Sequence, residues 1–358
     1  MSSPQSSWDA PAFRAEVQSA LDAFVDEQAL RLAPLGDDAA RLVGAARAAV
    51  SGGKRFRAAF CAWGFRAVRE EGPDADALVR AASALEVLHA SALVHDDYMD
   101  ASDTRRGRPA THKAFEALHR ESGWTGDPQQ YGAAAAILLG DLLLSWSDEL
   151  LRRCGMPHDV VRDAMAFFDT TRSEVIAGQF LDVSVQARGA SDVEQAMRVL
   201  RYKSAKYSIE RPLHVGAALA GADPGTLAAL TRFGLPLGEA FQLRDDLLGV
   251  YGDPDSTGKP AGDDLSEGKR TVLVALALAR APGGDAKRLD EALGTALSVE
   301  EVADLRRIID ESGAHAEVER RIEDLTTESL AALEAAPVTP ASRAVLRELA
   351  AAATQRTL

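Results

Sequence analysis

The sequence predicts an all-α fold, a large helical bundle of one domain around a deep central cavity. Apolar residues recur at three- and four-residue spacing in an Ala- and Leu-rich background from Phe13 onward, and no stretch has the alternation of a strand. Short Gly, Pro and Asp segments separate the helical stretches. Several stretches exceed the usual helix length, among them residues 74–100 and 157–187, which favours long central helices that line a cavity.

This periodicity gives the expected helices in chain order. In the first half they cover residues 11–33, 37–50, 54–71, 74–100, 108–120, 130–153 and 157–187. In the second half they cover residues 191–209, 211–221, 225–250, 269–281, 285–295, 298–312, 314–335 and 339–355. Pro212 is expected to interrupt or restart a helix. Residues 1–10 lack the pattern and are expected to be disordered, which leaves residues 11–358 as the single domain.

Composition and charge limit the classes of partner. The chain has 358 residues, 46% of them hydrophobic, which is enough for a large core. Its formal charge of −14 argues against nucleic acid or an anionic membrane, so an anionic ligand must be bound by local Lys and Arg clusters. Cys61 and Cys154 have no disulfide or zinc spacing, and no signal peptide or uncharged membrane-spanning stretch is recognisable. We expect a cytoplasmic protein with no integral membrane segment.

The first candidate site is the stretch 85–112, LEVLHASALVHDDYMDASDTRRGRPATH. Three carboxylates fall within an arc of roughly 100° on the predicted helix, those of Asp96, Asp97 and Asp100. They repel one another unless a cation is bound, although a solvated acidic helix end is the alternative. His89 shares the arc, and the cationic segment 105–109 follows. The pattern favours Mg²⁺ beside a phosphate-binding group.

A second cationic element lies at residues 51–57, SGGKRFR, a Gly-rich turn that leads into a helix. Backbone N–H groups and a positive helix start favour a bound anion there. An ordinary junction between a loop and a helix would have the same composition.

A second acidic cluster changes the interpretation of the first. Gln242, Asp245 and Asp246 again occupy one arc of about 100° on an otherwise apolar helix. Two such clusters facing each other would hold several Mg²⁺ ions, each bound by one or two carboxylates and by diphosphate oxygens. The loop 256–271 that follows is too polar to form core and is expected to be a mobile flap, or simply an exposed connector.

Six segments of the chain match, in order, those of a known family: GGKRFR, LHASALVHDDYMD with RRGRP, GQFLD, YKSA, FQLRDD and GKPAGDDLSEGKRT. The chain resembles the trans-isoprenyl diphosphate synthases of the polyprenyl synthetase family, and among them the geranylgeranyl diphosphate synthases. The resemblance implies a prenyltransferase of isoprenoid biosynthesis that condenses isopentenyl diphosphate with an allylic diphosphate. It also implies a homodimer, and three Mg²⁺ ions when substrate is bound.

The resemblance assigns a role to each matching position. The metal ligands would be the motif aspartates, Asp96, Asp97, Asp100, Asp245 and Asp246. The isopentenyl diphosphate site would consist of Lys54, Arg57, His89 and Arg106. The allylic diphosphate would contact Arg105, Lys203, Gln242 and Lys259, and further substrate-binding candidates are Gln179, Ser204 and Lys269. Gln179 and Asp182 match positions near the metal ions, and Asp264 matches the flap aspartate. The residues expected to carry catalysis are Asp96, Asp97, Lys203, Asp245 and Lys259.

Two positions depart from the family pattern. Gly249 stands where many members carry the third Asp of the second motif, and Ser204 replaces the usual Thr. Ser keeps the hydroxyl group, and a metal ion can be held by the first two carboxylates. We therefore expect neither change to abolish activity, and Gly249 leaves the third ligand of that helix open.

The residues and the resemblance predict the same chemistry. Breaking an allylic C–O bond leaves a carbocation and a diphosphate, so the protein must stabilise negative charge and exclude water. Mg²⁺ with Lys203, Lys259 and Arg105 would do the first, and an apolar tunnel with a closing flap would do the second. The resemblance implies that the released diphosphate takes the proton, so no side-chain base is expected.

Chain length depends on the floor of that tunnel. In this family the residues four and five positions before the first Asp often set it, and here they are the small Ala92 and Ser91. One helical turn rises about 5.4 Å, close to one isoprene unit, so Leu88 one turn earlier predicts a product near twenty carbons. Phe167 and Phe168 are alternative floors, and longer polyprenyl or farnesyl diphosphates are the alternative products. Replacing Ser91 by Phe should shorten the product.

Three other functions are alternatives to prenyl transfer. A class I terpene cyclase would share the fold, but it needs an Asn/Asp, Ser/Thr, Glu triad in place of Asp245-Asp246 and has no use for the cationic turn 51–57. A metal phosphohydrolase built on His95 and Asp96 would need a second pair of His ligands. A non-catalytic partner subunit would not need intact aspartate motifs.

Overall fold

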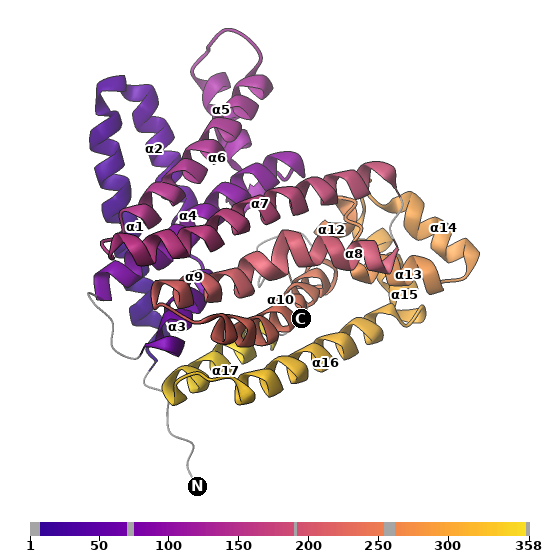
Figure 1. The fold of residues 1–358 in the computed structure, drawn as a ribbon. Helices are drawn as coiled ribbons and strands as arrows, with labels where there is room; N and C mark the ends of the chain where they lie inside the picture. The colour runs from indigo at the N-terminus through magenta and orange to yellow at the C-terminus, as the bar shows by residue number, and fades with distance from the viewer. Residues whose placement is uncertain (1–7, 70–74, 190–191, 254–261, 356–358) are drawn as a thin grey trace. The chain divides into compact units, whose positions relative to one another are not determined.

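The computed structural model describes residues 8–69, 75–189, 192–253 and 262–355, nearly all of them helical (Figure 1). The all-α prediction is confirmed. The chain divides into two compact units: unit 1 comprises residues 1–166 and 215–221, and unit 2 comprises residues 167–214 and 222–358. The single domain and the deep central cavity stay predictions.

Unit 1 is built around α4. Its elements are α1 (Ala10–Leu32), η1 (Ala33–Leu35), α2 (Asp37–Ala49), α3 (Phe56–Val68), α4 (Ala75–Met99), β1 (Thr104–Arg105), β2 (Arg108–Pro109), α5 (Thr111–Glu121) and α6 (Pro128–Arg152). Helix α4 packs against α1, α3, α5 and α6, and its residues 81–88 are all buried. Burial on every side explains its almost continuous apolar sequence.

Helix α4 also has the length and composition of a membrane span, the one such helix in the described part of the chain. However, 72% of its qualifying window is buried inside the protein. The helix therefore packs as a core element here.

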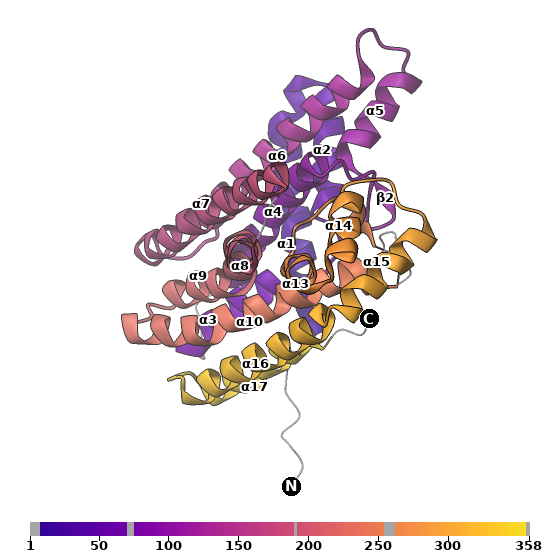
Figure 2. The ribbon, with the colours of Figure 1, turned by 90° about the vertical axis from the view of Figure 1, so that its right-hand side faces the viewer.

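Unit 2 is built around α10. Helices α7 (His158–Arg188) and α9 (Arg211–Leu219) span the unit boundary; the others are α8 (Val193–Val199), η2 (Leu200–Glu210), α10 (Pro224–Tyr251), α12 (Asp263–Ser266), α13 (Val272–Arg280), α14 (Gly283–Ala292), α15 (Val299–Glu311), α16 (Ala314–Ala335) and α17 (Pro340–Thr354). Helices α16 and α17 lie side by side (Figure 2). Leu243 and Leu247 of α10 join a core with Leu273, Ile309 and Val318.

The structure corrects four local predictions. Residues 8–10 are ordered, since the Trp8 ring centroid lies 5.0 Å from that of Phe13 and 5.4 Å from that of Trp63, whereas residues 1–7 lie outside the described part. A two-stranded hairpin, β1–β2, replaces the expected absence of strands, so α5 begins at Thr111. The short helix α12 was not expected.

The fourth correction concerns residues 191–209, which form α8 followed by an eleven-residue π-helix, η2. A π-helix has i→i+5 hydrogen bonds, is rare, and occurs often at functional sites. The conformation returns to α at Arg211, just before Pro212, and the missing N–H of the proline interrupts the backbone hydrogen bonds where η2 continues into α9.

His214 is a buried titratable group of unit 2. Its Nδ1 lies 3.3 Å from Arg211 Nη1, and its Nε2 lies 2.9 Å from Thr231 Oγ1. Burial is the main cause that lowers the pKa of His214 to about 4.

Acid is expected to destabilise the protein through His214. Between pH 6.5 and about 4, the imidazole of His214 is protonated in the unfolded chain but stays neutral in the folded one. The free energy of unfolding therefore falls by about 3 kcal/mol over this range. His214→Gln should remove that slope in urea unfolding measured from pH 7 to pH 4.5, while a matched change at the exposed His158 should not. Equal slopes in wild type and His214→Gln would contradict the assignment.

Candidate active site

The first aspartate motif ends α4 in unit 1. Asp97 is buried, and its Oδ1 accepts hydrogen bonds from Arg105, one of them 2.7 Å long from Nε. Arg105 Nη2 also lies 3.8 Å from Asp96 Oδ2. Asp96 and Asp100 are partly exposed. Arg105 thus neutralises part of the negative charge of the motif and contacts two of its aspartates.

The β1–β2 hairpin places Arg106 over the Gly-rich turn. Arg106 (φ 53°) and Gly107 (φ 71°) form the two-residue turn, in which both residues need a left-handed backbone. Arg106 Nη1 donates to the Ser51 carbonyl at 3.0 Å. A Cβ at Gly53 would lie only 3.1 Å from Arg106 Nη2, so the glycine leaves the space that the guanidinium uses.

His89 lies among these cations. Burial is the largest cause that lowers its pKa well below 6.5, followed by Arg57, Arg106, Arg105 and Arg55. The imidazole is therefore neutral at pH 7, and four arginines lie close to it. Such an environment attracts a polyanion, and a neutral imidazole can donate a hydrogen bond to it. Unit 1 therefore brings Arg57, Arg105 and Arg106 close to His89.

A buried ion pair supports the turn and was not found from the sequence. Arg55, with φ 56°, donates from Nη1 to Glu86 Oε2 at 3.2 Å and from Nη2 to Gln18 Oε1 at 2.6 Å. Glu86 Oε1 accepts from the Ala58 N–H in the first turn of α3 at 3.1 Å. The only sequence signal was that Glu86 is the one acidic residue in the apolar stretch 77–94. The pair holds the turn from which the exposed Lys54 projects.

The second aspartate motif lies near the end of α10 in unit 2. Gln242 Nε2 donates to Asp246 Oδ1 at 2.8 Å, one helical turn along. Burial raises the pKa of Asp246 to about 8, with Asp264 and Asp245 adding to the rise and Gln242 opposing it. The ionised form of Asp246 is therefore unfavourable until a cation compensates it.

The loop after α10 contributes Asp264 and Lys269 to the same region. Lys269 Nζ lies 3.3 Å from Asp264 Oδ1 and also pairs with Glu267. Lys259, the other predicted cation of this loop, lies outside the described residues, as does the segment 256–261 of the predicted flap.

Two glycines allow η2 to pack closely against α7 and α10 in unit 2. A Cβ at Gly178 of α7 would lie 2.8 Å from Lys203 Cα, and a Cβ at Gly238 of α10 would lie 2.8 Å from the Ala205 carbonyl carbon. This approach lets Lys203 Nζ pair with Asp182 Oδ2 at 2.6 Å. Gln179 and Ser204 are partly exposed nearby in sequence.

The aspartate motifs have the chemistry of a magnesium site that is completed by its substrate. In the described part of the chain no three His, Cys, Asp or Glu side chains form a ready-made metal cluster. Mg²⁺ needs no such cluster, since it uses one or two carboxylates, waters and phosphate oxygens. The buried Asp246 beside Asp245 and Asp264 fits that requirement. The two motifs lie in different units, so their facing each other stays a prediction.

The predicted tunnel floor lies on α4. Ser91 is buried, and its Oγ donates to the Gly140 carbonyl of α6 at 2.8 Å, so this side chain points toward α6. Ala92 is partly exposed, and Leu88 is fully buried. In unit 2, Phe168 is fully buried, and Phe167 packs on His214 with ring centroids 5.3 Å apart. Their roles in chain length stay predictions.

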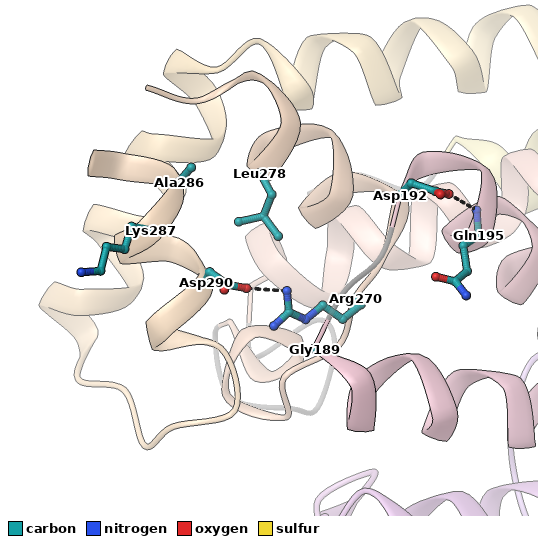
Figure 3. Close-up of a pocket in the computed structure, with 8 residues that line it drawn as sticks. All are labelled: Gly189, Asp192, Gln195, Arg270, Leu278, Ala286, Lys287 and Asp290. Atoms are coloured by element: carbon teal, nitrogen blue, oxygen red, sulfur yellow. Dashed lines mark hydrogen bonds and ion pairs between the residues drawn. The ribbon is translucent and has the colours of Figure 1, made fainter. Parts of the chain in front are cut away.

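An open groove of unit 2 encloses about 670 Å³ away from these residues (Figure 3). Its lining contains none of the predicted site residues. Arg270 Nη1 donates to Asp290 Oδ1 at 2.5 Å, and Asp192 caps α8 by accepting from the Gln195 N–H. These polar groups satisfy one another, as the dashed lines in Figure 3 show, which is typical of a structural surface groove.

His95, which a metal phosphohydrolase would use as a ligand beside Asp96, lies against α6 instead. His95 Nε2 lies 3.2 Å from the Ile137 carbonyl and 3.6 Å from Asp141 Oδ1, both on α6. A Cβ at Gly140 would overlap this imidazole, so α6 provides a fitted space for it. His95 therefore packs on α6 and does not join Asp96.

An all-α fold with two aspartate motifs, cations beside the first and a buried carboxylate in the second defines the class of trans-isoprenyl diphosphate synthases. The polyprenyl synthetase family model matches residues 40–311. The chain belongs to the polyprenyl synthetase family.

Known relatives cover most of the chain. It is 35% identical over 245 residues to a short chain isoprenyl diphosphate synthase of Methanothermobacter thermautotrophicus, covering 68% of this chain and 69% of that protein. It is 33% identical over 280 residues to a (2E,6E)-farnesyl diphosphate synthase of Mycobacterium tuberculosis, covering 75% and 71%. A geranylgeranyl pyrophosphate synthase structure from Corynebacterium glutamicum, complexed with isoprenyl diphosphate and magnesium, matches with TM-score 0.95 and 41% identity over 98% of this chain and 100% of that one.

Glu86→Gln is expected to raise the KM for isopentenyl diphosphate about tenfold, equivalent to 1.4 kcal/mol, with a smaller change in kcat. Loss of the Glu86 charge leaves the buried Arg55 without a charged partner, so the support of the turn with Lys54 and Arg57 is weakened. Steady-state kinetics measures the effect, and the exposed Glu121→Gln is the control. A lower melting temperature with an unchanged KM would show that the Arg55–Glu86 pair has a purely structural role.

Proposed function

We propose that this prenyltransferase condenses isopentenyl diphosphate with an allylic diphosphate to make geranylgeranyl diphosphate. The observation that carries the proposal is the arrangement in unit 1, where Arg105 contacts the aspartates and also belongs to the cations around His89. An anion site beside a carboxylate motif suits two diphosphate substrates that react with each other.

In this proposal, one set of residues binds isopentenyl diphosphate and another set promotes ionisation of the allylic diphosphate. Arg57, Arg106 and neutral His89 bind and orient isopentenyl diphosphate. Lys203 and Arg105 donate to the allylic diphosphate and stabilise the negative charge that develops on it. The aspartates would hold about three Mg²⁺ ions, which neutralise the leaving diphosphate when bound. The proton lost after the attack passes to that diphosphate, as the family resemblance implies.

The product length rests on α4. Ser91 and Ala92 are small, and the fully buried Leu88 lies one turn before them. The likeness to a geranylgeranyl pyrophosphate synthase supports a product of about twenty carbons, since one helical turn of small residues admits about one isoprene unit.

A homodimer in the cytoplasm is part of the proposal. On α7, Ile176, Phe180 and Val183 expose an apolar stripe with three- and four-residue spacing, and on α6 Ile137 and Leu138 are exposed. Apolar stripes of this kind favour association with a second copy. Cys61 and Cys154 are free thiols, in keeping with a reducing compartment. Sedimentation as a monomer at micromolar concentration would contradict the dimer.

One assay tests the reaction. The purified chain is incubated with Mg²⁺, isopentenyl diphosphate and each short allylic diphosphate, and the prenyl products are identified by mass. Product near twenty carbons is expected. Turnover by the isolated chain would exclude a non-catalytic subunit, a cyclic hydrocarbon would indicate a terpene cyclase, and no product would refute the proposal.

A further inference from the structure

The α10 position that lacks an aspartate lies against another carboxylate. Gly249 follows Asp245 by four residues and Asp246 by three, so its side chain would lie on their helical face. A Cβ built on Gly249 would overlap the Asp264 carboxylate. Even the farthest atom of that group, Oδ1, would be only 3.0 Å away. Asp264 thus occupies the space into which a side chain at position 249 would extend.

Short-range structure holds Asp264 there. Leu265, the next residue, is fully buried and belongs to the core of unit 2 with Leu247 and Leu273. The Lys269 N–H donates to the Asp264 carbonyl at 2.9 Å, and Lys269 Nζ lies 3.3 Å from its Oδ1. The position of Asp264 is therefore fixed by hydrogen bonds to Lys269 and by the burial of Leu265 beside Leu247 of α10.

We propose that Asp264 supplies the third carboxylate of the second aspartate motif, and that Gly249 is the residue that admits it. The inference rests on the proposed function, because it concerns the carboxylates that face the diphosphate-bound Mg²⁺. It explains how a chain with Gly at this position keeps three acidic groups in the cluster. The side chain comes from α12 instead of α10, and only a glycine leaves room for it.

A reciprocal exchange tests the inference. Binding of inorganic diphosphate is measured by calorimetry with and without Mg²⁺ for Asp264→Ala, Gly249→Asp and the double variant. We expect Asp264→Ala to weaken Mg²⁺-dependent binding at least tenfold. Gly249→Asp alone should also weaken Mg²⁺-dependent binding, because the new side chain would overlap with that of Asp264. The double variant should recover most of the loss, since the acid is then restored on α10.

Control variants distinguish a specific role of Asp264 from misfolding and from failure of the proposed function. Asp263→Ala, at the adjacent acid, should bind as wild type does, and binding without Mg²⁺ should be equal in all variants. If Gly249→Asp does not fold, the isosteric Asp264→Asn must still show the tenfold loss. Wild-type Mg²⁺-dependent binding by Asp264→Ala or Asp264→Asn, or a double variant as weak as the product of the single effects, would overturn the inference. If wild type makes no prenyl product at all, the proposed function fails instead.

Discussion

Asp96→Asn is expected to lower kcat for prenyl transfer about a thousandfold, which corresponds to about 4 kcal/mol of lost transition-state stabilisation. The asparagine keeps the size of the side chain and removes the charge that a magnesium ion requires. Asp96 is partly exposed, and its Oδ2 lies 3.8 Å from Arg105 Nη2. The substitution should therefore leave the fold intact.

The measurement is a single-turnover rate at saturating Mg²⁺, with thermal unfolding as the check on folding. Asp103→Asn is the matched control, since Asp103 follows the same motif, is largely exposed and pairs with Lys113 Nζ at 3.1 Å. It should react within about twofold of wild type, as expected for a surface pair. Equal rates for Asp96→Asn and wild type would remove the first motif from the chemistry.

Ala92→Phe is expected to shift the main product from about twenty to about fifteen carbons, because an aromatic ring fills roughly one helical turn of tunnel. Ala92 is partly exposed on α4, so the ring does not have to enter the packed core. Product masses from the condensation assay measure the shift, with Ala92→Ser as a control that leaves the length unchanged.

Ser91→Phe should shorten the product too, but at a greater cost in stability. Its Oγ lies 2.8 Å from the Gly140 carbonyl, so a phenyl ring there would press on the α6 backbone. We therefore expect a lower melting temperature for Ser91→Phe than for Ala92→Phe. An unchanged product distribution in both variants would show that α4 does not form the floor.

The sequence was sufficient for the fold class and for most helices. Long amphipathic stretches such as α10 and α16 begin and end within a residue or two of their predicted limits, because capping residues and apolar spacing act locally. The π-helix η2 could not be predicted this way. Its geometry depends on contact with Gly178 and Gly238, which are far from it in sequence.

The candidate site was predictable to the same extent. Arg105 and the motif aspartates are close in sequence, and the structure places Asp97 and Arg105 in direct contact. The roles of Arg55 and Glu86 depend on a contact between α4 and the turn before α3, and that of Asp264 depends on a space at Gly249. Tertiary contacts of this kind leave no local pattern in a single sequence.

The close packing of η2 has a consequence for how substrate preference can change. Helices that meet through glycine hydrogens cannot slide by a fraction of a residue without a main-chain clash. The backbone of Lys203 and Ala205 is therefore fixed between α7 and α10, and Asp182 Oδ2 accepts a hydrogen bond from the Lys203 amine at 2.6 Å. Under the proposed function, the charged end of the substrate therefore keeps one position at Lys203, and we expect differences in prenyl tail length to arise at other positions, such as Ala92.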